Sequence, residues 1–162
     1  MLSIAFLPAL ARHGQAQLAN QKGTLRGHQA VFISVTTPQT DEARKQLGLV
    51  RESLERFIIE RLTAAGLHAT NQFVDQTLIL EINVDVHKVS TTGTEPIFAF
   101  VSQFEAAQAA RLAANRQSAL AVTWKSMRFG AVTKAQAGLL RDSVVANVDE
   151  FVRDWKSAQA GE

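Results

Sequence analysis

The clearest pattern in the sequence is a helical stripe of apolar residues in its first half. Between residues 47 and 65, apolar side chains recur at intervals of three and four, and Glu and Arg side chains occupy the opposite positions. This spacing predicts an amphipathic helix. Gly66 stands where a left-handed cap would end it, and the start lies either near Asp41 or at Leu49, after Gly48.

A second helical stripe lies near the end of the chain. Over residues 134–157, apolar positions again repeat at helical spacing, with charged residues mostly opposite. The stripe consists of Leu140, Val144, Val148, Phe151 and Trp155. We therefore expect one long helix, followed by a frayed tail at residues 158–162.

Two segments have the pattern of strands. Residues 29–35 are apolar and β-branched, which is typical of a central strand. From Thr77 to His87, apolar and polar residues alternate, so this strand should bury one face and expose the other.

The alanine-rich segment 102–115 fits two structures. Its composition has high helix propensity, which favours a helix. Read at a period of two, however, it has an aromatic face and a polar face. The aromatic face consists of Phe98, Phe100 and Phe104, and the polar face includes Gln103 and Glu105. We favour one long strand from residue 97, with the helix as the alternative.

Another strand is predicted at residues 118–129, after a hairpin turn at residues 115–117. Period two places Leu120, Val122 and Trp124 on one side of this strand. We expect Trp124 to be a core residue, as we do Trp155.

These elements predict a single α+β domain at residues 29–157, with the order βαβββα. The expected architecture is a two-layer sandwich, in which an antiparallel sheet of about four strands carries two helices on one face. Residues 17–28 are polar and predict a flexible lead-in.

The amino terminus has the pattern of an export signal. The apolar run at residues 2–11 is shorter than the about 20 residues that span a bilayer, but it suits the core of a secretory signal. Small residues at Gly14 and Ala16 allow cleavage before Gln17, which makes residues 1–16 the signal peptide. Because no basic residue precedes the run, a buried first element is the alternative. We expect a periplasmic or secreted product with no integral membrane segment.

Composition narrows the function. The 162 residues include 17 basic and 15 acidic side chains, a net charge of +2 with no basic stripe, which argues against a nucleic-acid partner. The absence of cysteine excludes disulfides, thiolate metal sites and a lipid-anchored amino terminus.

Few residues have the spacing that catalysis requires. The four histidines show no metal-ligand spacing, no serine lies in a Gly-x-Ser-x-Gly turn, and no glycine pair forms a phosphate loop. The best constellation is Asp85 and His87 beside Glu81, which could bind a divalent metal or provide a general base. We expect no enzyme activity and no cofactor.

Several segments of residues 25–157 carry a resemblance to known proteins. They are Leu25 to Val35, Gly48 to Val50, Leu78 to Val84, and the pair Thr123-Trp124. In these segments the chain resembles small secreted bacterial proteins of unassigned role. Its topology is also similar to the amino-terminal domain of the Tol-system β-propeller protein and to the lipoprotein partner of the lipopolysaccharide-assembly barrel. Both resemblances imply binding to envelope components without an active site, although this chain lacks the lipidated cysteine of the second family.

We therefore predict a non-catalytic binding or envelope-assembly module that acts through its sheet surface on an envelope protein partner. The predicted binding residues are Glu81, Asn83, Asp85, His87, Gln103 and Glu105. Edge strands of the sheet could also accept a partner strand. One alternative is a metal-binding protein or hydrolase that uses Asp85 and His87. Another is a small-molecule carrier with an apolar cavity lined by the three phenylalanines of the long strand.

Overall fold

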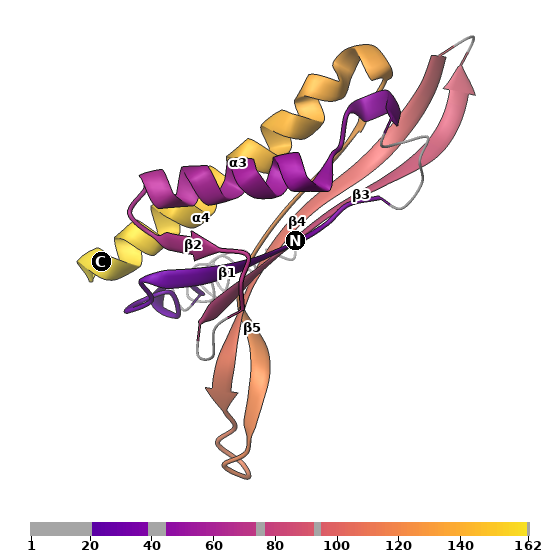
Figure 1. The fold of residues 1–162 in the computed structure, drawn as a ribbon. Coiled ribbons are helices and arrows are strands. Elements are labelled where there is room, and N and C mark those ends of the chain that lie inside the picture. The colour runs from indigo at the N-terminus through magenta and orange to yellow at the C-terminus, as the bar shows by residue number, and fades with distance from the viewer. Residues whose placement is uncertain (1–20, 39–44, 74–76, 93–94, 162) are drawn as a thin grey trace, which may run out of the picture.

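A computed structural model describes residues 21–38, 45–73, 77–92 and 95–161. The predicted signal peptide and residues 17–20 lie outside the described residues. The described residues form one sheet and two long helices, drawn in Figure 1. The strands are β1 (Ala30–Thr36), β2 (His68–Thr70), β3 (Leu78–Thr92), β4 (Glu95–Arg111) and β5 (Ser118–Val132). The helices are α3 (Arg51–Ala64), the short 3₁₀ helix η1 (Lys134–Gln136) and α4 (Ala137–Ala160).

The predicted α+β class is confirmed, but the sheet differs from the prediction in two ways. The described strands number five, in the order β2-β1-β3-β4-β5, and β1 runs parallel to both of its neighbours. The prediction of an antiparallel sheet holds only for the β3–β4–β5 meander. The additional strand β2 has three residues, too few for an alternating pattern to show. It is parallel to β1 because α3 crosses over the sheet between them.

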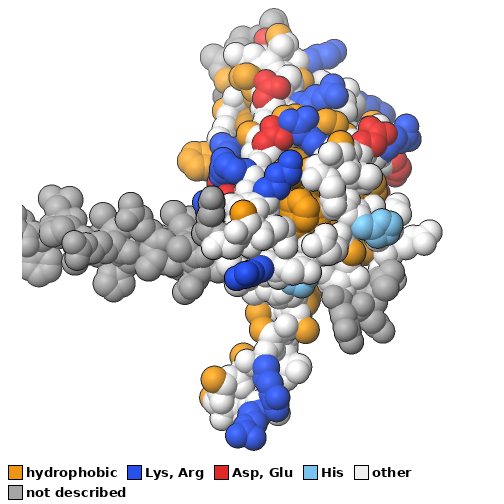
Figure 2. All heavy atoms as spheres, turned by 90° about the vertical axis from the view of Figure 1, so that its left-hand side faces the viewer, with side chains coloured by type: hydrophobic (Ala, Val, Ile, Leu, Met, Phe, Trp, Pro, Cys, Tyr) orange, Lys and Arg blue, Asp and Glu red, His pale blue; other side chains and the backbone are white. Residues whose placement is uncertain are grey.

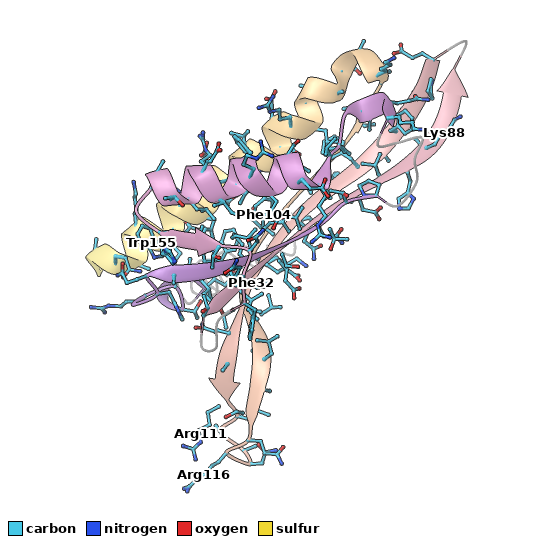
Figure 3. The ribbon with its side chains drawn as sticks, in the orientation of Figure 1. Phe32, Lys88, Phe104, Arg111, Arg116 and Trp155 are labelled. Atoms are coloured by element: carbon cyan, nitrogen blue, oxygen red, sulfur yellow. The ribbon has the colours of Figure 1, made fainter. Side chains whose placement is uncertain are left out.

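Both long helices pack on one face of the sheet, as predicted (Figure 1). Alternating residues of β1, β3 and β4 are buried beneath them, which confirms the period-two pattern of these strands. In Figure 3, Phe104 and Trp155 lie between the sheet and the helices. Trp124 and Trp155 are both buried, as predicted.

A buried polar cluster accompanies the apolar contacts of α4. The amide nitrogen of Asn147 donates to the carbonyl and hydroxyl oxygens of Ser102 at 2.9 and 3.0 Å. The Ser126 hydroxyl lies 2.9 Å from Asn147 Oδ1 and 2.8 Å from Glu150 Oε2, and it can donate its proton to either. The Arg128 guanidinium also donates to Glu150 Oε2. These hydrogen bonds fix α4 in one position over β4 and β5.

The long strand predicted across the alanine-rich segment is confirmed, and the helix alternative is wrong. β4 runs from Glu95 to Arg111 and pairs with β3 as far as Ala107 and with β5 as far as Arg111. This pairing outweighs the intrinsic helix propensity of alanine, which amounts to less than about 1 kcal/mol per residue.

Beyond residue 107, β4 pairs only with β5, and the two strands form a hairpin arm over residues 107–122. Figure 1 shows this arm projecting from the body. A β-bulge marks its root, since Trp124 pairs with Ala106 and Val122 pairs with the next residue of β4. Thr123 is the extra residue. The bulge corrects the prediction that Leu120, Val122 and Trp124 share a side, because it reverses the faces of the strand: Trp124 is buried, whereas Leu120 and Val122 are 61% and 53% exposed.

Residues 21–28 are packed against the domain rather than forming part of a flexible lead-in. Leu25 is fully buried in the core. The Gln108 amide donates to the Thr24 carbonyl at 3.2 Å, and Trp155 Nε1 donates to the His28 carbonyl at 2.8 Å. The domain therefore begins earlier than residue 29.

The end of the last helix also differs from the prediction of a tail that frays from residue 158. α4 continues to Ala160, and Ala158 is buried. Gln159 donates to the Leu25 carbonyl at 3.0 Å and accepts from the Gly27 amide at 3.1 Å. The end of α4 and the segment at residues 21–28 thus hold each other in place. This is a long-range contact, which the local sequence pattern does not reveal.

Candidate functional site

The candidate site is the sheet face that the described helices leave uncovered, called the open face here. β3 contributes to it the polar residues of its alternating pattern, and β4 contributes Gln103 and Glu105. Glu81 lies directly opposite Glu105, and Asn83 lies opposite Gln103. Asp85 and His87 continue along β3 on the same face. The structure therefore places all the predicted binding residues together, and their role in binding stays a prediction.

A shallow hollow of about 260 Å³ lies on the open face. It is lined by Ser34, Thr36, Glu81, Ile82, Asn83, Gln103 and Glu105. Lys125 Nζ approaches Glu105 Oε1 at 2.8 Å, whereas Glu81 forms no ion pair with any described residue. Two carboxylates on directly opposite residues repel each other, so this hollow favours a cationic group from outside.

An apolar patch adjoins the hollow, and the sequence reasoning missed it. Val101, Met127 and Phe129 lie on the open face and are 37%, 52% and 79% exposed. Phe129 is directly opposite Val101, and Met127 is opposite Gln103, so the patch and the polar residues are continuous. The signal was available in the alternation of residues 125–131, but it emerges only once the bulge at Thr123 fixes which face is outside.

Asp85 and His87 form the contact on which the metal or hydrolase alternative depends. His87 Nε2 lies 2.8 Å from Asp85 Oδ2, and both side chains are at least half exposed. The third residue of that constellation, Glu81, is four residues from Asp85 along the strand, about 13 Å away at the usual strand rise. No group of three or more His, Cys, Asp or Glu side chains within the described part of the chain could hold a metal ion together.

The carrier alternative places a cavity at Phe98, Phe100 and Phe104. All three side chains are packed into the core, with exposures of 1%, 7% and 0%. An apolar cavity of about 330 Å³ lies elsewhere, between the starts of α3 and α4. It is lined by Leu47, Gly48, Leu49, Val50, Ser53, Leu54, Phe57, Ala137, Gly138 and Arg141. The three phenylalanines are therefore core residues, and none of them lines this cavity.

Comparison with known proteins gives distant structural likenesses. No protein-family model matches the chain, and no curated protein is significantly similar to it in sequence. A lipoprotein of Neisseria meningitidis is 10% identical with a TM-score of 0.43, covering 76% of this chain and 98% of that one. A minor lipoprotein of Acinetobacter baumannii is 11% identical with a TM-score of 0.41, covering 82% and 93%. The rare lipoprotein B of Shewanella oneidensis is 12% identical with a TM-score of 0.37, covering 79% and 94%.

Neither α3 nor α4, nor any other helix in the described ranges, combines the length and the apolar character needed to cross a membrane.

Proposed function

We propose that this protein is a non-catalytic, exported binding module of the cell envelope, which engages a protein partner through its open face. The observation that carries the proposal is the apolar patch of Val101, Met127 and Phe129, exposed beside a row of polar side chains. Soluble domains rarely leave large aromatic side chains exposed in a contiguous patch unless the patch binds something.

The composition of the open face suits a protein partner. Interfaces typically have an apolar centre, enriched in aromatic residues and methionine, within a polar rim. Phe129 and Met127 supply such a centre, and Gln103, Asn83 and Asp85 supply polar groups beside it. Because the surface is a sheet with only a shallow hollow, it fits a broad macromolecular surface better than a small ligand, which binds in a deep cavity.

A pull-down with matched variants tests this proposal. Phe129→Glu places a charge at the centre of the patch, and Leu139→Glu places the same charge on an exposed leucine of α4, away from the open face. The full chain is immobilised and incubated with an extract of the cells that make it. The wild-type chain should retain partner proteins, and Phe129→Glu should retain at least about tenfold less of them, as expected for a hot-spot residue. Leu139→Glu should retain them. Equal retention by both variants, or no retained protein from a strictly monomeric bait, contradicts the proposal.

The export part of the proposal rests on the apolar run at residues 2–11. Amino-terminal sequencing of the protein recovered from the cell envelope or the medium should give a start at Gln17. A product that retains Met1 contradicts export by a cleaved signal.

A further inference from the structure

The hairpin arm is the second unusual surface of the molecule. Its only charged residues are Arg111 and Arg116, and it contains no acidic residue. Figure 3 shows both arginines at its far end, and Figure 2 shows blue side chains gathered there with hydrophobic ones along the arm. Neither arginine forms an ion pair with any described residue. Leu112 and Leu120 are 45% and 61% exposed.

The end of the arm cannot contact the open face of its own chain. Arg111 is six residues along β4 from Glu105, which is about 20 Å at the usual strand rise. The arm also points away from the body (Figure 1). The two arginines are therefore out of reach of the carboxylates on the open face of their own chain.

The open face complements the arm in charge. Over the paired residues 79–87, 99–107 and 125–131 it carries Glu81, Asp85, Glu105 and Lys125 as its charged groups. With histidine neutral, that is a formal net charge of −2, against +2 on the arm. In the hollow, Glu105 already has Lys125 at 2.8 Å, whereas Glu81 forms no ion pair with any described residue and can bind a guanidinium through both of its carboxylate oxygens.

The apolar surfaces also correspond. On the open face the apolar patch adjoins the acidic hollow, since Met127 is opposite Gln103, one of the hollow's lining residues. On the arm, Leu112 follows Arg111 directly in the turn, and Leu120 extends the apolar surface along β5. An arm laid across the face would set arginine against carboxylate and leucine against Phe129.

We infer that the partner of the open face is the hairpin arm of a second copy of this chain. This inference rests on the proposed function and names its partner. The arm and the open face are different surfaces, so the contact is heterologous, and a pair of copies keeps one free face on the first copy and one free arm on the second. Such contacts continue head to tail, as a closed ring or an open filament.

Charge reversal tests the inference with the full chain in sedimentation velocity experiments over a concentration series. Wild-type protein should associate with increasing concentration, and added salt should weaken the association because it screens the charges. Two double variants reverse the charges of one surface each. One carries Arg111→Glu with Arg116→Glu, and the other carries Glu81→Lys with Glu105→Lys. Each should sediment as a monomer where the wild type associates, with the association weakened at least about tenfold. In each variant the arm and the face carry charge of the same sign.

Mixing the two double variants is the decisive experiment. An acidic arm then meets a basic face, and a basic arm meets an acidic face, so a one-to-one mixture should regain wild-type association. Matched controls reverse exposed charges of α3, namely Arg51→Glu with Arg56→Glu and Glu52→Lys with Glu60→Lys. These controls should associate as wild type does, and all variants should show the wild-type circular dichroism spectrum.

Two results would overturn the inference. One is a wild-type protein that stays monomeric to millimolar concentration, and the other is a mixture that stays monomeric although the wild type associates. In either case the proposed function is still decided by the Phe129→Glu pull-down. If that pull-down recovers proteins other than a second copy, and Phe129→Glu fails to retain them, the open face binds a different protein.

Discussion

Replacing Asn147 should destabilise the domain without changing any side chain of the open face. It therefore separates the stability of the sheet from the chemistry of its exposed surface. The side chain is fully buried in the middle of α4 and has partners at both of its polar atoms. Its amide nitrogen donates to the carbonyl and hydroxyl oxygens of Ser102, and its Oδ1 lies 2.9 Å from the Ser126 hydroxyl, which can donate to it or to Glu150. Asn147→Ala removes these contacts and leaves a small void between α4 and β4.

The expected loss in the free energy of unfolding depends on which polar groups Asn147→Ala leaves unpaired. Ser126 still has Glu150 at 2.8 Å, so it stays satisfied. Ser102 is buried and loses the donor to its hydroxyl, and an unsatisfied buried polar group costs about 1–3 kcal/mol. The void adds roughly 1 kcal/mol. Asn147→Ala should therefore lower the free energy of unfolding by about 2–4 kcal/mol. Asn147→Asp should lower it further, because it buries a carboxylate close to the one on Glu150.

Urea denaturation followed by tryptophan fluorescence measures this loss, since Trp124 and Trp155 are both buried and report on the same core. At a typical dependence of about 2 kcal/mol per molar urea, the midpoint for Asn147→Ala should fall by roughly 1–2 M. Asp142→Asn, an exposed change on the same helix, is the control and should leave the midpoint unchanged. A loss below about 0.5 kcal/mol, as for an ordinary surface change, would refute the role of this cluster, as would Asn147→Asp being more stable than Asn147→Ala.

Three further changes probe the core and the alternative site. Gly130→Ala would place its Cβ 2.8 Å from the Phe100 ring, so the ring must move and thermal denaturation should show a loss of about 1–3 kcal/mol. Trp124→Phe removes the indole that donates to buried Asp154 at 3.1 Å, and urea denaturation should show a loss of about 1–3 kcal/mol. His87→Ala should leave zinc binding in calorimetry unchanged, because the open face offers that ion two ligands where a site requires three or four.

Each of these has an outcome that would contradict its reasoning. Gly138→Ala meets open space in α4, so it should be neutral or stabilising; a loss as large as that of Gly130→Ala would mean that the close approach is not the cause. Trp124→Phe at full stability would show that Lys22 and Arg153, each 3.4 Å from Asp154, satisfy the carboxylate without the indole. Tight zinc binding that disappears with His87→Ala would restore the metal alternative.

Much of the fold could be predicted because burial leaves a regular trace in the sequence. The apolar stripe ending at Trp155 predicted α4, and the alternation from Thr77 predicted β3 with its buried side correctly assigned. Strand direction left no such trace, since a short β2 brought parallel to β1 by a crossover has no local pattern. The packed segment around Leu25 was also missed, because its contacts with Gln159 join distant parts of the chain.

The candidate site was predictable in its polar half only. Glu81 and Asn83 were recognised because they are polar members of the alternating pattern, and the sheet places them opposite Glu105 and Gln103. The apolar half depends on the bulge at Thr123, which turns one side of β5 outward and the other inward. A bulge is set by cross-strand register, and single-strand periodicity does not contain that information.

Site-specific photo-crosslinking in the cells that make the protein decides whether the open face is the binding surface. A photoreactive amino acid replaces Phe129 in one variant and Leu139 in another, so that exposed apolar side chains are compared on the open face and on α4. We expect discrete covalent adducts from position 129 and none from position 139. Adducts from position 139 alone, or the same adducts from both positions, would contradict it.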